Sequence, residues 1–397
     1  MRILITIDSF YDGGAEMAAI RLANALQQQG EKIVFLELNS QLSSEKKQIR
    51  ILCKDIHLYQ PDYNTIVAFF YKMRFLVPVF FKPEFTRLYH FIKKLSIKLM
   101  LWKENIWIIN SHHISTDDFF SKMNSSKYLL VSSFHGHYEL LQKENSDGDK
   151  VKGTFSRIFE GVDHIVYTAD KHKQTLESFS YPLHRTSRIY YGIDFNYTII
   201  PTTYYVGNTL SICVVSRAIA GKGWEELVQA TLNLSAKNNY RLKLHLIGDG
   251  PLLDYLKDKY SKIPNIEFCG YKTTEEIFEH LNYHTHITAL LSTFEAESMP
   301  NSIIEYLACG KPVIATDNGA IPEMLEYNGE LAGTIIKLTD RKLNIEDVED
   351  AIKCYLNDPK LVEIQSVHAF KAFEKFRIEK SVGQYQQLFK ELSNQMS

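Results

Sequence analysis

Several features that would assign the chain to a particular class are missing. No stretch approaches the roughly 18 consecutive apolar residues that a membrane-spanning helix requires. The five cysteines are odd in number and contain no C-x-x-C pair, so we expect reduced thiols and not a disulfide framework. The opening residues MRILITIDSF have neither the basic nor the apolar region of a signal peptide, which favours a cytoplasmic location.

Charge and length exclude further classes. A formal net charge of -2 gives no chain-wide attraction to nucleic acid, and we expect no nucleic-acid partner. At 397 residues the chain is longer than one hydrophobic core usually serves, so two domains are expected. No internal repeat or low-complexity tract is present.

The apolar patterning predicts an α/β fold with two doubly wound halves. Residues 2–8 form a β-rich apolar run, DGGAE breaks it, and apolar residues then recur at helical spacing up to Gly30, before a second strand at 32–38. Such a unit places a helix against a parallel sheet. Further strands are predicted at residues 107–110, 128–132, 163–168, 210–216, 242–247, 266–269, 286–291 and 312–316, and a last helix at 367–396.

Residues 192–208 separate the two alternating blocks. This segment is poor in periodicity and contains Pro201 and Gly207, which favours a linker. We therefore expect an N-terminal Rossmann-like domain over residues 1–190 and a C-terminal Rossmann-like domain over residues 208–370.

Two carboxylates mark the loop and helix that follow the strand at 286–291. The segment reads TFEAESMPNSIIEYLACGKPVIAT, a polar loop, a Pro-Asn-Ser helix start and a stop at Gly310. Glu305 lies one turn after Asn301 and Ser302, so a diphosphate at this helix start would place its ribose near Glu305 and its sugar near Glu297. The alternative is that both are helix-terminal charges favoured by the helix dipole.

A resemblance to a known family starts from the same residues. Residues 297–323 read ESMPNSIIEYLACGKPVIATDNGAIPE and are similar to the nucleotide-sugar signature of retaining glycosyltransferases of family 4, which has two glutamates with seven residues between them. Other segments match landmarks of that family in the expected order, namely DGGAE, RIYYGID, VVSRAIAGKGWEELVQA, HLIGDGPLLDYL and EFCGY. The resemblance implies the GT-B architecture, in which an acceptor domain and a donor domain face a central cleft and a C-terminal helix, here residues 371–397, crosses back to the first domain.

The resemblance also implies roles for individual residues. Arg217 and Lys222 are expected to contact the donor diphosphate, and His135 to lie near the reacting sugar together with Glu297. Fixed cations suit a leaving group on which negative charge develops, and they do so without a metal. Exposed loop charges and a structural histidine are the alternatives. The remaining donor-binding residues are expected to be Gly13, Gly14, Gly248, Tyr271, Ser298, Met299, Asn301, Ser302 and Glu305.

The sequence also departs from the family pattern. Ser-Met-Pro stands where Gly-Phe-Gly is commoner, Ala320 replaces a glycine, and Tyr191 stands where asparagine is usual. Because Pro300 has no N–H, its neighbours must supply any phosphate contact.

No metal or cofactor is expected from the sequence. Asp147-Gly148-Asp149 resembles a D-x-D motif but lies in a polar run, and the histidine pairs at 112–113 and 135–137 lack a convincing third ligand. Gly248-Asp249-Gly250 lacks the full G-x-G-x-x-G fingerprint, which argues against a nicotinamide dehydrogenase.

Residues 71–103 carry a local excess of positive charge. They contain eight lysines and arginines against one acid, Glu84, which gives +7 in a chain whose total is -2. Apolar residues follow helical spacing at Phe85, Leu88, Tyr89, Ile92, Leu95, Leu99 and Trp102. An amphipathic helix of this kind either lies on an anionic membrane surface or packs its apolar stripe on the core and exposes a basic face.

Together these features predict a hexosyltransferase that acts on a nucleoside diphosphate sugar as donor substrate. The expected acceptor is a glycan or lipid-linked hydroxyl in surface polysaccharide or lipopolysaccharide synthesis, with retention at the anomeric carbon and peripheral attachment to the inner face of the membrane. The alternatives are a nucleotide-sugar epimerase of similar two-domain fold, which would need no acceptor, and a non-catalytic sugar-binding protein, which would tolerate loss of Arg217 and Lys222.

Overall fold

The computed structural model describes residues 1–10, 13–42, 51–76, 78, 81–123, 127–136, 148–195, 209–238, 241–295 and 297–396. Three sites discussed above, His137, Asp147 and most of the expected linker, lie outside these ranges.

The first sheet is parallel and has seven strands in the order β3-β2-β1-β4-β5-β6-β7. Its strands read as nearly continuous apolar runs because helices cover both faces. The strands are β1 (Arg2–Ile7), β2 (Lys32–Glu37), β3 (His57–Tyr59), β4 (Ile108–Ser111), β5 (Leu129–Phe134), β6 (His164–Tyr167) and β7 (Thr186–Arg188). The associated helices are α1 (Gly14–Gln28), α4 (Ile114–Ser121), α6 (Gly148–Glu160) and α7 (Asp170–Ser178).

The second sheet repeats this design with six parallel strands in the order β10-β9-β8-β11-β12-β15. The strands are β8 (Thr209–Val215), β9 (Arg241–Ile247), β10 (Ile266–Gly270), β11 (Ile287–Leu290), β12 (Val313–Thr316) and β15 (Gly333–Ile336), and a small hairpin adds β13 (Glu326–Tyr327) and β14 (Glu330–Leu331). The helices are α8 (Trp224–Asn238), α9 (Leu253–Tyr260), α10 (Thr274–His284), α11 (Asn301–Ala308), α12 (Ile321–Leu325) and α13 (Ile345–Asn357).

In both sheets the strand order reverses next to the first strand, between β1 and β4 and again between β8 and β11. Ligands of such sheets bind beyond the carboxyl ends of the strands at this reversal. The predicted α/β class with two doubly wound halves is confirmed.

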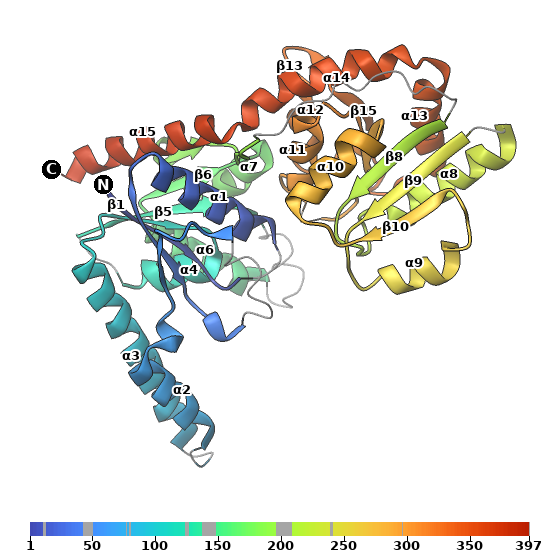
Figure 1. Ribbon diagram of the computed structural model, residues 1–397. Coiled ribbons are helices and arrows are strands. Elements are labelled where there is room, and N and C mark those ends of the chain that lie inside the picture. The colour runs from blue at the N-terminus through green and yellow to red at the C-terminus, as the bar shows by residue number, and fades with distance from the viewer. Residues whose placement is uncertain are drawn as a thin grey trace.

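The C-terminal segment crosses from the second sheet back to the first (Figure 1). A single helix over 367–396 is wrong, because α14 (Lys360–Phe373) and α15 (Ile378–Met396) are separated by a short 3-10 turn at Glu374–Phe376 and by Arg377 in an extended conformation. The crossing itself is as expected. In α15, Val382, Tyr385 and Phe389 pack in the core of the first domain, and the Tyr385 hydroxyl lies 2.8 Å from Ser133 Oγ.

Two helices, α2 (Thr65–Leu76) and α3 (Lys82–Lys103), project from the first domain as a hairpin (Figure 1). The predicted apolar stripe does not face the core, because Leu88, Leu95, Leu99 and Trp102 are exposed, and Trp102 retains 76% of its accessible surface. The opposite face of α3 is the buried one.

Tyr89, which was expected in the apolar stripe, and Lys93, which was counted among the basic residues, both lie on that buried face. Tyr89 is buried, and its hydroxyl donates a hydrogen bond to Asp62 Oδ1 at 2.7 Å. Lys93 is buried beside it with Nζ 3.1 Å from Asp62 Oδ1, so it holds the hairpin to the domain and adds no surface charge. No helix in the described ranges is both long and apolar enough to span a bilayer.

Candidate active site

A cleft of about 970 Å³ separates the two sheets. One wall comes from Gly13 and the length of α1, whereas the other comes from the β10–α10 loop and the first half of each of α10 and α11. The second wall includes the loop that follows the carboxyl end of β10, the end of a parallel strand at which open α/β sheets bind ligands. The sequence-predicted residues that line the cleft are Gly13, Gly14, Tyr271, Asn301 and Glu305.

The first wall depends on two glycines. A Cβ atom on Gly13 would lie 2.3 Å from Glu16 Oε2, and one on Gly14 would lie 3.1 Å from Asn301 Nδ2. Asn301 donates a hydrogen bond to the Gly14 carbonyl at 3.5 Å, so the two domains touch here. Glu16 is buried, with Oε1 3.2 Å from His113 Nε2. A side chain at either glycine would therefore displace the end of Glu16 or Asn301.

The second wall is positioned by Tyr306 in α11. Its buried hydroxyl accepts a hydrogen bond from the Val215 amide at 2.6 Å, which ties the helix to the end of β8. Glu305 then faces the first domain, and its Oε1 atom lies 3.5 Å from the guanidinium of Arg21. Burial raises the pKa of Glu305, and the positive charge of Arg21 opposes that rise. A carboxylate and a guanidinium from different domains therefore meet inside the cleft.

A second charged pair joins the loops after β8 and β11. Lys222 Nζ lies 2.5 Å from Glu297 Oε2, and both side chains are largely buried. Lys222 also lies over the Phe294 ring, 5.3 Å from its centroid. The loop that carries Lys222 turns at Gly221 and Gly223, whose φ angles of 80° and 76° are free of strain only for glycine.

His135 follows β5 in a chain of polar side chains. It forms a hydrogen bond with the Tyr191 hydroxyl, and its Nε2 atom lies 3.1 Å from His112 Nδ1. Burial lowers the pKa of His112 to about 3, so that ring is neutral at pH 7. His135 is itself mostly buried and is not among the described residues that line the cleft.

His172 connects this series of polar side chains to the second domain. A Cβ atom on Gly136 would lie 3.0 Å from His172 Nε2, and the same nitrogen lies 2.8 Å from Ser298 Oγ. Because Ser298 directly follows Glu297, His135 lies close to the part of the interdomain boundary that holds the Lys222–Glu297 pair.

The other predicted residues take different positions. Arg217 is exposed beyond β8. Gly248 has φ 141°, and a Cβ atom there would lie 1.9 Å from the Ser216 carbonyl oxygen, so glycine is required where the ends of β8 and β9 pack. Met299 is buried in the core of the second domain, and Ser302 lies in the first turn of α11.

Among the side chains that join the domains, Arg21, His172 and Arg188 were not identified from the sequence. Arg188 forms an ion pair with Glu323 of α12 and lies 3.1 Å from Asp170 Oδ1. Arg188 is the first residue of the RIYYGID segment, and that resemblance is the signal that could have identified it. No spacing pattern in the sequence connects Arg21, His172 or Arg188 to a partner more than a hundred residues away.

Comparisons with known proteins agree with this geometry. The model of the family "Glycosyltransferase Family 4" matches residues 12–197, and that of "Glycosyl transferases group 1" matches residues 206–371. An uncharacterized glycosyltransferase of Methanocaldococcus jannaschii, MJ1178, is 24% identical over 86% of this chain and 92% of its own length. The O-antigen biosynthesis glycosyltransferase WbnH of Escherichia coli is 33% identical over 25% of this chain and 27% of its own length.

Among solved structures, Anabaena Alr3699/HepE in complex with UDP superposes with a TM-score of 0.70 at 16% identity, covering 98% of this chain and all of that one. This likeness shows that the chain has the GT-B fold, with its cleft between the two domains. The chain belongs to the group 1, family 4 glycosyltransferases.

Proposed function

We propose that the protein is a retaining hexosyltransferase that uses a nucleoside diphosphate sugar as donor. The observation that carries this proposal is the interdomain cleft, in which Glu305 of the second domain faces Arg21 and the glycine-rich start of α1. The neighbouring structure of HepE was determined with UDP and with UDP-glucose, which supports a nucleotide-sugar donor.

The donor site would use the described residues in distinct ways. Glu305 would accept hydrogen bonds from the ribose hydroxyls, and Glu297 from the hexose. Arg217 and Lys222 would offset the charge of the diphosphate, helped by amides at the starts of α1 and α11. The expected contacts at Gly248, Tyr271, Ser298, Met299, Asn301 and Ser302 complete the proposed donor site.

The chemistry follows from the leaving group. As the bond between the anomeric carbon and the phosphate oxygen breaks, negative charge develops on the nucleoside diphosphate, and the two cations stabilise it. We propose that the leaving phosphate oxygen takes the proton of the acceptor hydroxyl on the same face of the sugar, so the new bond forms with retention. Neither a metal nor a cofactor is proposed for this step. His135, which lies near the interdomain boundary that holds Lys222 and Glu297, is proposed to lie near the reacting sugar.

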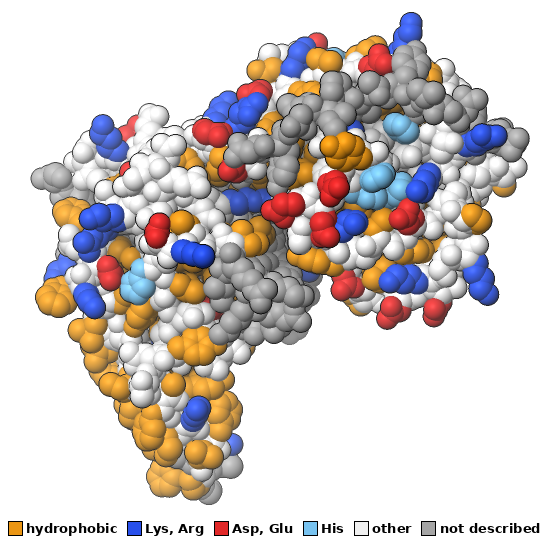
Figure 2. Space-filling view, viewed as in Figure 1, with side chains coloured by type: hydrophobic (Ala, Val, Ile, Leu, Met, Phe, Trp, Pro, Cys, Tyr) orange, Lys and Arg blue, Asp and Glu red, His pale blue; other side chains and the backbone are white. Residues whose placement is uncertain are grey.

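The acceptor is proposed to be a glycan or a lipid-linked precursor of a surface polysaccharide. The partial match to an O-antigen glycosyltransferase supports this choice. The hairpin of α2 and α3 supports a peripheral position on the membrane, because its outer face is rich in hydrophobic side chains (Figure 2). Such a position would bring the cleft to a lipid-linked acceptor.

A donor screen followed by stereochemical analysis tests the proposal. Among UDP-, GDP- and ADP-hexoses, the true donor should raise the melting temperature, since a ligand at 100 times its Kd stabilises the folded state by about 2.7 kcal/mol. The slow hydrolysis of that donor, followed by proton NMR, should release sugar of the same anomeric configuration. A sugar of inverted configuration, or no stabilisation by any nucleotide sugar, would overturn the proposal.

A further inference from the structure

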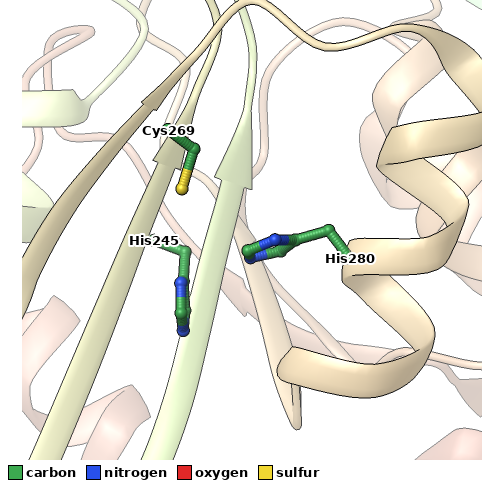
Figure 3. Close-up of side chains that lie close together, drawn as sticks. All are labelled: His245, Cys269 and His280. Atoms are coloured by element: carbon green, nitrogen blue, oxygen red, sulfur yellow. The ribbon is translucent and has the colours of Figure 1, made fainter.

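Three side chains from three elements of the second domain lie close together (Figure 3). They are His245 in β9, Cys269 in β10 and His280 in α10, and their nitrogen and sulfur atoms all lie within 4.8 Å of one another. His245 is paired with Glu267 across the parallel strands, and Cys269 lies two residues further along β10, where the strand register shifts, with its sulfur atom on the face of the sheet that carries His245. Helix α10 covers that face and supplies His280.

The two imidazoles are buried without the hydrogen bonds that such groups normally make. His245 and His280 expose 2% and 8% of their surface, and within the described residues neither nitrogen of His245 nor Nε2 of His280 has a hydrogen-bond partner. A buried polar atom without a partner costs about 1–3 kcal/mol. Three such atoms at one point form a set of donors and acceptors that a small ligand can contact directly.

The remaining contacts of the cluster are weak. His245 Nδ1 lies 3.4 Å from Glu267 Oε2, which is within ion-pair distance but without hydrogen-bond geometry. The Cys269 thiol contacts the Glu267 carbonyl oxygen at 3.8 Å. A neutral imidazole offers the lone pair of one ring nitrogen to a metal ion.

We propose that His245, Cys269 and His280 form a binding site for a zinc ion. Two imidazoles and a thiolate are the ligands that this borderline-soft cation prefers. Zinc bonds of about 2.0–2.1 Å to nitrogen and about 2.3 Å to sulfur place tetrahedral ligand atoms about 3.3–3.6 Å apart, so modest side-chain rotations complete the geometry. Zinc binding releases the thiol proton, because the thiolate is the ligand. The Glu267 carboxylate, 3.4 Å from His245 Nδ1, and His284, one turn after His280 with its ring centroid 5.2 Å from that of His280, are both near enough to be considered as the fourth ligand.

The position of the proposed zinc site beside one wall of the cleft indicates a structural role for the ion. Cys269 and His280 flank the segment from Tyr271 to Phe278, which supplies most of the second wall of the cleft. An ion bound to both ends of this segment and to β9 fixes the wall against the sheet. Zinc therefore acts on the stability and shape of the cleft and not on the transfer step.

The test uses the full-length, tag-free, reduced protein after removal of metal. Calorimetric titration should show one zinc ion bound per chain, and zinc should raise the melting temperature. Titration with Co²⁺ should produce a thiolate-to-cobalt charge-transfer band, which reports the sulfur ligand directly. These measurements do not depend on transferase activity.

Two variants and a control make the assignment specific. Cys269→Ser should abolish the charge-transfer band, and both it and His280→Gln should weaken zinc binding by at least about 10-fold. Cys354→Ser, at an exposed cysteine elsewhere in the domain, should change neither. The metal-free variants are checked by circular dichroism, and His280→Gln provides the test if Cys269→Ser does not fold. Absence of stoichiometric zinc binding, or wild-type binding by both variants, would overturn the site.

Discussion

At Lys222 a single ammonium group contacts a carboxylate and an aromatic face at once. Its position is fixed by the two glycine turns on either side and by Glu297, and little solvent reaches it. Electrostatic interactions in such a place are less screened than at the surface. Arg217, by contrast, is exposed, and therefore its replacement disturbs no packing.

Replacing either cation with alanine should lower turnover by about 10²- to 10³-fold, because each would stabilise the charge that develops on the leaving diphosphate. Steady-state kinetics with the donor found in the screen measures this, and melting curves check that the variants fold. Lys262→Ala, at an exposed lysine of the same domain, is the control. Turnover near wild type in both variants would refute the roles of Arg217 and Lys222. Added Mn²⁺ should not restore either variant.

Substitutions of Glu305 and Glu297 should affect nucleotide binding and turnover differently. Glu305→Gln should weaken binding of the free nucleoside diphosphate by about 10-fold or more, since a neutral amide replaces the acceptor of two ribose hydroxyls and leaves Arg21 without its charged partner. Glu297→Gln should leave that binding nearly unchanged and lower turnover, because its proposed contact is the hexose. Isothermal titration calorimetry with the nucleoside diphosphate separates the outcomes. Equal losses of affinity would show that the roles are assigned wrongly.

At the scale of elements, prediction from the sequence succeeded wherever a strand is long and buried. β1, β2, β8 and β9 lie within about one residue of their predicted limits, since each has six or seven residues with enough apolar ones to give a clear strand pattern. The missed strands of the two large sheets, β3, β7 and β15, have three or four residues each and are only partly buried. So short a segment carries too little periodicity to be recognised.

In the candidate site, too, local features were predicted from the sequence and long-range contacts were not. Residues in the loop and first turn of α11 could be named in advance because one contiguous segment contains them. The contacts of Arg21 with Glu305 and of His172 with Ser298 could not, because they depend on how two domains meet. The cluster of His245, Cys269 and His280 escaped prediction for a similar reason, since its members are spaced like no metal motif and come together only through strand pairing and the packing of α10.

The α2–α3 hairpin has an apolar surface that no other described part of the protein covers. Around α3 the exposed apolar residues Phe81, Leu88, Phe91, Leu95, Leu99 and Trp102 form one stripe. Arg87 and Lys98 are exposed at its edge. A stripe of this kind inserts into the lipid interface while the basic residues meet anionic headgroups.

We expect the protein to co-sediment with anionic vesicles at low ionic strength and only weakly with neutral ones. Arg87→Glu with Lys98→Glu should abolish binding, because each basic residue near an anionic surface contributes about 1 kcal/mol and the reversal adds repulsion. Phe91→Ser with Trp102→Ser should weaken it independently of salt. Lys262→Glu with Lys380→Glu makes the same charge change elsewhere and should have no effect. A wild type that ignores anionic vesicles would refute the membrane surface.

At the scale of the whole molecule, buried ionisable groups in both domains couple stability to pH. Burial lowers the pKa of His164 and of His286 to about 4 and of His112 to about 3. Asp117 acts in the opposite sense, since burial raises its pKa to about 7. The total pH dependence is therefore a difference between opposing groups, and comparison of single variants isolates each one.

His286 offers the cleanest comparison. Its Nδ1 atom accepts a hydrogen bond from the Ser211 amide at 3.0 Å, a bond that a glutamine oxygen can accept instead. The unfolded chain protonates this histidine near pH 6.5 and the folded chain only near pH 4, so the unfolded state binds more protons between those values and stability falls as pH falls through that window. Relative to wild type, His286→Gln should flatten the dependence of the unfolding free energy on pH by up to about 1.4 kcal/mol per pH unit between pH 6.5 and 4. Urea unfolding at half-unit pH steps measures this, with His184→Gln, an exposed histidine of the first domain, as the control that should leave the dependence unchanged. Identical pH profiles for wild type and His286→Gln would show that His286 is as accessible to protons in the folded protein as in the unfolded chain.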